Sequence, residues 1–123
     1  MADKVIDASA LAAVVFAEPE AKAIEARIRG HDLFAPTLLP FEMGSVCLKK
    51  LRAHPRQRDA IHARFALLAS IPIELSPIEP AAAVEVAELF ALSAYDASYL
   101  LLARQIQAEL ITLDTELLDA AAR

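Results

Sequence analysis

The sequence is poor in the residues that several kinds of functional site require. Of its 123 residues, one is cysteine, three are histidine and two are glycine. The single cysteine, Cys47, provides neither a disulfide framework nor a cysteine metal site. The histidines form no HExxH motif or ligand pair, which disfavours a zinc site. Gly30 and Gly44 form no glycine-rich phosphate loop, which disfavours nucleoside-triphosphate chemistry.

Long apolar runs are also lacking. The longest run near the N-terminus, residues 8–17, contains Ser9 and stops at Glu18. A membrane-spanning helix needs roughly 20 apolar residues. The run also lacks the basic lead-in and the small-residue cleavage site of a signal peptide. We therefore expect no membrane segment and a cytoplasmic location.

Apolar residues are abundant, at 57% of the chain with a mean hydropathy of +0.41. A chain of this length is typical of one domain, and we expect a single domain over residues 1–123. Such a domain buries roughly two-thirds of its unfolded surface. The high apolar content indicates that a partner or a second copy covers part of the remaining surface.

The apolar pattern predicts short strands that alternate with helices. The predicted strands cover residues 4–6, 33–35, 72–75 and 110–112. The predicted helices cover residues 9–17, 20–29, 38–53, 56–70, 80–92, 94–108 and 115–122, with Thr37 as a candidate cap of the third. Strands separated by helices form parallel sheets covered on both faces. We predict an α/β fold, namely a three-layer α/β/α sandwich with a short parallel central sheet.

Two acids follow predicted strands directly. Asp7 follows the strand at residues 4–6, and Asp114 follows the strand at residues 110–112. In open α/β sheets, ligands bind beyond the carboxyl ends of the strands. Aspartate at such a position also caps the helix that comes next. Taken singly, neither acid distinguishes a binding role from a capping role.

Two further acids stand on predicted helices among apolar neighbours. The helical neighbours of Glu42 are Leu38, Leu39, Ser45 and Val46. Those of Asp96 are Leu92, Ser93, Tyr99 and Leu100. A buried carboxylate is costly unless it is paired or bound to a metal. The alternatives are a capping box between Ser93 and Asp96 and, for Glu42, an arginine partner or a side chain that extends to solvent.

Together these four acids predict a site for a divalent cation. Mg²⁺ and Mn²⁺ prefer oxygen ligands, and Mg²⁺ commonly uses a few carboxylates, waters and substrate phosphate. The candidate ligands are Asp7, Glu42, Asp96 and Asp114.

Four segments of the chain resemble motifs of the PIN-domain family, in its VapC-type toxin branch. They are VIDASALAAVVFAEP, APTLLPFEMGSVCLKKL, LSAYDASYLLLA and LITLDTELL, in the family's order and spacing. The resemblance implies an Mg²⁺- or Mn²⁺-dependent endoribonuclease that hydrolyses RNA phosphodiester bonds. It also implies the toxin of a toxin–antitoxin pair, which a cognate antitoxin inhibits. A homodimer is expected as well.

The resemblance also assigns roles to individual residues. Asp7, Asp96 and Asp114 are implied metal ligands, and Glu42 is a ligand or orients the attacking water. The hydroxyls of Ser9 and Thr112 are implied to support these carboxylates. The chain departs from the family pattern where Ser45 replaces a frequent asparagine, and where Gln107 and Ala108 replace the usual glycine before the last strand.

The net charge of −5, from 17 acidic and 12 basic residues, taken alone disfavours a nucleic-acid partner. Neutralising the four clustered acids with metal leaves −1. Six basic residues, against one acid, lie between positions 49 and 64. The basic residues expected to contact RNA phosphates are Lys49, Lys50, Arg52, Arg56 and Arg58. The alternative for this stretch, which also holds Arg64, is an ordinary solvated surface.

A signalling receiver and a non-catalytic binding module are the alternatives to the nuclease. A signalling receiver needs a phospho-acceptor aspartate on a central strand and a lysine at a later strand end. Residues 72–75 end without an aspartate, and residues 110–114 contain no lysine. A non-catalytic PIN-like binding module is the main alternative, and the presence of all four acids argues against it.

Overall fold

The computed structural model describes residues 2–123. Its centre is a four-stranded sheet in the order β3-β2-β1-β4, in which every neighbouring pair is parallel. The strands are β1 (Lys4–Ile6), β2 (Leu33–Pro36), β3 (Glu74–Ser76) and β4 (Glu109–Ile111). The predicted parallel sheet is confirmed, and each strand lies within two residues of its predicted position.

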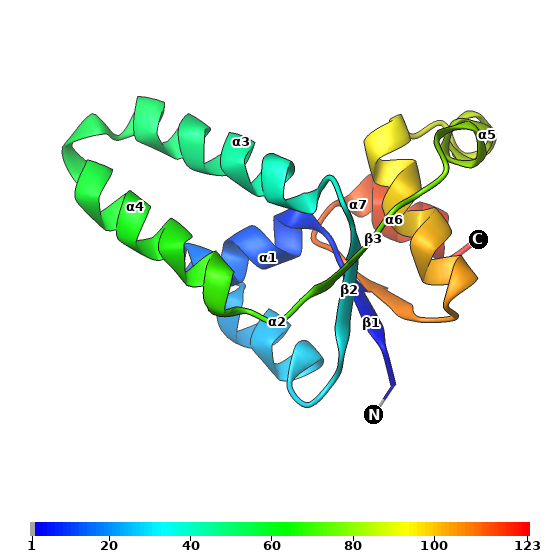
Figure 1. Ribbon diagram of the computed structural model, residues 1–123, viewed down its shortest axis with the longest axis horizontal. Coiled ribbons are helices and arrows are strands. Elements are labelled where there is room, and N and C mark those ends of the chain that lie inside the picture. The colour runs from blue at the N-terminus through cyan, green and yellow to red at the C-terminus, as the bar shows by residue number, and fades with distance from the viewer. Residues whose placement is uncertain (1) are drawn as a thin grey trace.

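Helices flank the sheet on two sides (Figure 1). In this view α1–α4 lie to the left of the strands and α5–α7 to the right, as the predicted α/β/α arrangement requires. The helices are α1 (Ala8–Val15), α2 (Ala21–Ile28), α3 (Leu39–Ala53), α4 (Arg58–Ala66), α5 (Pro80–Phe90), α6 (Ala94–Gln105) and α7 (Thr115–Ala121).

Two local predictions are wrong. The helix predicted over residues 56–70 is split, because 3-10 turns at Pro55–Gln57 and Leu67–Ser70 flank α4. Thr37 does not cap α3, since the N-cap position is Leu38 and carries no side-chain cap. The Thr37 N–H instead donates to the Ser76 carbonyl at 3.2 Å, which extends the pairing of β2 with β3 by one residue.

β1 forms the buried axis of the sheet. Val5 and Ile6 are fully buried and pair with β4 at Leu110 and Ile111. A parallel strand covered by helices on both faces must be apolar on both sides, which explains two consecutive β-branched residues. The Asp7 N–H donates to the Ile111 carbonyl at 3.1 Å. The ladder therefore continues to the acid and holds its backbone in place.

Helices α3 and α4 form an antiparallel arm that extends away from the sheet (Figure 1). Arg64 of α4 attaches this arm to the first helix, because its Nε donates to the Val15 carbonyl at 2.8 Å. The Lys50 ammonium lies 5.0 Å from the centre of the Phe16 ring and 3.9 Å from a Glu18 carboxylate oxygen. Two of the arm's basic residues therefore contact α1 or the turn after it.

Within residues 2–123, no single helix is long and apolar enough to cross a membrane. Only α5 and α6 taken as a pair reach that length and composition, and they are bent by 101°.

Gln107 adopts a left-handed backbone conformation, with φ of 55°, in the turn before β4. The single glycine that the resemblance leads one to expect before the last strand is replaced around Gln107 and Ala108. Left-handed geometry costs an L-residue roughly 1–2 kcal/mol, and glycine largely avoids this penalty.

We predict that Gln107→Gly raises the free energy of unfolding by about 1 kcal/mol, net of the extra chain entropy that glycine loses on folding. The measurement is urea unfolding at constant m-value. Gln107→Ala is the matched control, because it removes the same side chain and keeps the backbone penalty. Equal stabilities of the two variants would contradict the prediction.

Candidate active site

Asp7 is a buried carboxylate at the carboxyl end of the central strand, with 5% of its surface exposed. Its Oδ1 accepts hydrogen bonds from the Ala10 N–H at 3.0 Å and the Ser9 hydroxyl at 2.7 Å. Its Oδ2 accepts a short hydrogen bond from the Thr112 hydroxyl. Asp7 thus caps α1, which was the alternative to a binding role, and Ser9 and Thr112 contact the carboxylate.

The two hydroxyls are themselves held by backbone N–H groups of the segment between β4 and α7. Ser9 Oγ accepts the Leu113 N–H at 2.9 Å, and Thr112 Oγ1 accepts the Asp114 N–H at 3.0 Å. Each hydroxyl has one hydrogen, and both hydrogens point to Asp7. The two hydroxyl oxygens, Ser9 Oγ and Thr112 Oγ1, lie 3.3 Å apart but share no hydrogen bond, because neither has a hydrogen left to donate. The network fixes the plane of the Asp7 carboxylate.

The capping bonds leave acceptor positions free on Asp7 and Asp114. A carboxylate has about four acceptor positions, of which Asp7 uses three, and one remains on Oδ2. Asp114 caps α7, with Oδ1 accepting the Leu117 N–H at 3.0 Å. Capping and cation binding therefore do not compete for the same lone pairs.

Glu42 lies half-buried in the first turn of α3 and has a tyrosine partner. The Tyr99 hydroxyl donates to Glu42 Oε1 at 2.6 Å, and Tyr99 is buried in α6. Burial raises the pKa of Glu42, the Tyr99 hydrogen bond opposes this, and the charges of Asp96 and Asp7 raise it further. Burial and the bond to Glu42 raise the pKa of Tyr99, so its hydroxyl remains a donor.

Sequence reasoning missed Tyr99 as a partner of the site and treated it as an apolar neighbour of Asp96. A signal for it does exist. Tyr99 follows Asp96 by three residues, so the two side chains share one face of α6. A tyrosine buried on the face of an acid needs a hydrogen-bond partner, and Glu42 supplies it.

Asp96 lies in the first turn of α6, where its N–H donates to Ser93 Oγ at 3.0 Å. Burial raises the pKa of Asp96, and the charges of Asp114 and Asp7 raise it further. Burial also raises the pKa of Asp7, and the charge of Asp114 adds to it, against the hydrogen bonds from Thr112, Ala10 and Ser9. The four acids therefore interact electrostatically at one edge of the sheet.

The positions of the acids follow from the topology. Asp7 and Asp114 precede helices that leave strands β1 and β4, and Glu42 lies in the first turn of the helix that leaves β2. Asp96 lies in the first turn of α6, the helix that leads into β4. Helix N-termini carry a partial positive charge that stabilises nearby anions.

Within the described residues, no basic side chain forms an ion pair with any of these four acids. The ion pairs found over residues 2–123 join Glu109 to Lys4 and Arg27, and Glu18 to Lys50. Within the same residues, no three Asp, Glu, His or Cys side chains are gathered closely enough to hold a metal ion. The donor set of four carboxylates without cationic partners nonetheless fits Mg²⁺ or Mn²⁺, because Mg²⁺ usually binds through only one or two carboxylates and keeps several waters as its other ligands.

The basic residues of the arm separate into two groups. Lys49, Arg52, Arg56 and Arg58 are exposed. Arg58 lies against His62, with Nη1 donating to Nε2 at 2.9 Å. Lys50 is partly buried against Phe16 and Glu18. Of the five basic residues predicted to contact RNA, four therefore remain on the open surface.

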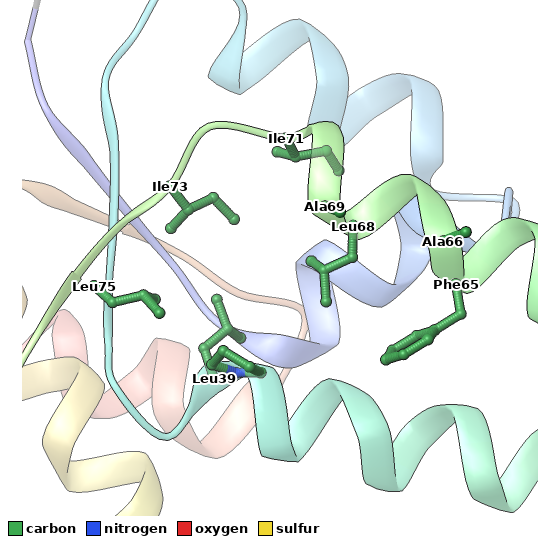
Figure 2. A pocket seen from close by; sticks show the side chains of 9 residues that line it. Leu39, Phe65, Ala66, Leu68, Ala69, Ile71, Ile73 and Leu75 are labelled. Atoms are coloured by element: carbon green, nitrogen blue, oxygen red, sulfur yellow. The ribbon is translucent and has the colours of Figure 1, made fainter.

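Two hollows are relevant to binding. One, of about 490 Å³, lies beside Glu42 and is lined by Ala8, Leu38, Phe41, Glu42, Ser45, Val46 and Tyr95. The other is an apolar groove of about 390 Å³ between the start of α3, the end of α4 and β3. Figure 2 shows Leu39, Leu68 and Ile73 around this groove. None of the four acids lines the apolar groove.

The sequence matches the PIN domain over residues 4–123. The chain belongs to the PIN domain family. PIN domains are typically nucleases. The chain is similar to the crystal structure of PAE2754 from Pyrobaculum aerophilum, with 28% identity, a TM-score of 0.77, and coverage of 97% of this chain and 86% of that one. No curated protein sequence matches it significantly.

We predict that in EDTA the stability of this PIN domain falls as the pH rises above the ordinary pKa of carboxyl groups, about 4. Asp7, Glu42 and Asp96 have raised pKa values in the folded state. Between the two pKa values of each group, the folded chain therefore holds a proton that the unfolded chain has released. The stability that this proton provides is lost as the pH rises through the raised pKa of the folded state. Urea unfolding between pH 4 and pH 7 measures the effect.

Two variants separate this effect from the rest of the titration. Glu42→Gln removes one of the raised groups and keeps an acceptor for Tyr99, so its stability should fall less steeply with pH. Hydrogen bonds from Lys4 and Arg27 lower the pKa of Glu109, against partial burial. Glu109→Gln should therefore make the fall steeper. A Glu42→Gln curve parallel to that of the wild type would contradict the prediction.

Proposed function

We propose that this PIN domain is an Mg²⁺- or Mn²⁺-dependent endoribonuclease that hydrolyses RNA phosphodiester bonds. In this proposal it is the VapC-type toxin of a type II toxin–antitoxin pair and acts in the cytoplasm. One observation carries the nuclease assignment. Asp7 is buried at the end of the central strand, two hydroxyls orient it, and three further acids without cationic partners share its edge of the sheet.

The four acids would hold the cation, with Asp7, Asp96 and Asp114 as ligands and Glu42 as a ligand or as the group that orients the attacking water. When bound, such an ion activates water and stabilises charge on the phosphate. Ser9 and Thr112 hold the Asp7 carboxylate in one plane, so its remaining lone pair keeps a fixed direction. Tyr99 restricts Glu42 in the same way.

The exposed cations of the arm would bind the RNA backbone. Lys49, Arg52, Arg56 and Arg58 extend along α3, the 3-10 turn and α4. Their charges offset the repulsion that an acidic chain exerts on RNA. The sequence predicts the same role for Lys50, but its contacts with Phe16 and Glu18 leave its ammonium less available to RNA.

A cognate antitoxin and a second copy of the chain are the proposed protein partners. Support comes from the apolar composition and from the groove in Figure 2, whose lining is almost entirely apolar. The alternative function is a non-catalytic PIN-like binding module. It is favoured by the absence, within residues 2–123, of three acids already gathered around one point.

We predict that the purified protein, freed of any antitoxin, cleaves RNA with Mg²⁺ or Mn²⁺ and stops in EDTA. Asp7→Asn should reduce the rate at least about 100-fold, since even groups that only orient a metal ligand are worth about 10–100-fold. Ser9→Ala should reduce it about tenfold by the same reasoning. Cleavage of a labelled RNA on denaturing gels measures both.

Asp119→Asn is the matched control, because Asp119 is an exposed acid of α7. This variant should cleave RNA at the wild-type rate. Circular dichroism and urea unfolding establish that Asp7→Asn is folded. Activity that survives EDTA and Asp7→Asn would exclude the metal-nuclease mechanism. RNA binding without cleavage under any metal condition would favour the binding module.

We predict that Arg56→Ala combined with Arg58→Ala weakens RNA binding and its dependence on salt. Each lost phosphate contact on a single strand lowers the slope of log K against log [salt] by about 0.7. Fluorescence anisotropy with a labelled RNA at several KCl concentrations gives the slope. Arg29→Ala, which removes an exposed arginine after α2, should leave it unchanged. An unchanged slope in the double variant would exclude phosphate contact by these arginines.

A further inference from the structure

Two aromatic side chains stand unusually exposed next to the acids. Phe41 is 83% exposed and Tyr95 is 65% exposed. Over residues 2–123, the chain's other five aromatic side chains are buried or partly buried. Phe41 directly precedes Glu42 in the first turn of α3, and Tyr95 directly precedes Asp96 in the first turn of α6. The two exposed rings therefore lie on separate helices, each one residue from an acid of the site.

Both rings line the same hollow, of about 490 Å³. Glu42 is the only charged residue of its lining, and Ala8, which follows Asp7, also contributes. The hollow thus has apolar walls with an acid on one side. Phosphate or a cation would find few polar partners on those walls. A flat apolar ring, in contrast, can stack against the aromatic faces.

The surface beyond the hollow favours a nucleic acid as the occupant. Phe41, Ser45 and Lys49 are four residues apart along α3, so they lie on one face, and all three are exposed. Arg52 is exposed one turn further, about 16 Å along the helix from Phe41. One helix therefore presents an aromatic ring near the acids and cations farther out. This order matches a polyanion whose bases present flat faces that can stack on aromatic rings.

The other exposed apolar side chains show that exposure alone does not explain this arrangement. Val84 and Leu89 of α5 are 58% and 74% exposed, but both are aliphatic and neither lines the hollow. Aromatic rings stack on every nucleobase, whereas aliphatic side chains do so poorly. The rings are also carried on helices rather than on loops, so little conformational entropy is lost when a base binds.

We propose that Phe41 and Tyr95 bind an unpaired RNA base by stacking and thereby position the neighbouring phosphate at the acids. This inference rests on the proposed nuclease function and adds to it a substrate requirement. The nucleotide beside the scissile bond is unpaired, because a base within a duplex has no free face for either ring. The two rings act as positioning residues and touch the base rather than the reacting phosphate.

The test uses a short unstructured RNA that carries one 2-aminopurine, whose fluorescence falls when the base stacks. The protein is titrated into this RNA in EDTA, where the proposed cleavage does not occur. Wild-type protein should quench the fluorescence. Phe41→Ala and Tyr95→Ala should each weaken binding by between about 5-fold and 150-fold, the range measured for loss of one stacking residue.

Matched variants identify stacking as the cause. Phe41→Trp should retain the quenching, while Phe41→Leu, which remains apolar without an aromatic face, should lose it. Leu89→Ala removes a comparably exposed side chain outside the hollow and should bind RNA like the wild type. In Mg²⁺, the aromatic variants should raise KM more than they lower kcat, and replacement of the adjacent base by an abasic nucleotide should remove the difference between them and the wild type.

Unchanged quenching in Phe41→Ala and Tyr95→Ala would overturn the proposal, as would full retention by Phe41→Leu. If Phe41→Ala or Tyr95→Ala instead dissociates a wild-type dimer in light scattering and leaves RNA binding unchanged, the hollow is a protein interface. That result would also overturn the proposal. The nuclease proposal can fail while the stacking proposal holds. If no RNA is cleaved but the rings still quench 2-aminopurine, the stacking site stands and the chain is a binding module.

Discussion

The Asp7 carboxylate, buried and held between two hydroxyls, is the interaction on which the rest of the site depends. It connects β1, α1 and the segment between β4 and α7, because its partners Ser9 and Thr112 belong to the two latter elements. The same hydroxyls accept the Leu113 and Asp114 N–H groups. The position of one buried charge therefore also determines the chain path that brings Asp114 to this edge of the sheet.

This arrangement is unfavourable for the metal-free fold. Burial and mutual repulsion raise the pKa values of Asp7, Glu42 and Asp96, so ionising them at neutral pH works against folding. Helix N-termini and hydroxyl donors offset part of that cost. Strain of this kind is characteristic of functional sites, where a ligand of opposite charge restores the balance. A structural role alone would be served as well by neutral caps.

The sequence predicted the sheet well, because two consecutive β-branched residues before Asp7 and the apolar run before Thr112 are local signals. It also drew attention to four acids that interact at one edge of the sheet, two because they follow strands and two because they stand among apolar helical neighbours; their role as metal ligands stays a prediction. It could not predict partners that tertiary packing selects. Tyr99 bonds to Glu42 across 57 positions, and Lys50 packs on Phe16 rather than facing solvent. Thr37 failed as a cap because β2 continues its pairing with β3 through the Thr37 N–H, and α3 begins only after Leu38, which takes the N-cap position.

Helix α3 combines several of these requirements. Its buried face, with Leu39, Met43 and Cys47, packs toward the core, while Glu42 on a neighbouring face reaches Tyr99. Its exposed face carries Phe41 and then the cations of the arm. Because α3 follows β2 directly, the pairing of β2 with β1 sets how far Glu42 lies from Asp7. The short central sheet therefore aligns the core, the acids and the exposed surface through one helix.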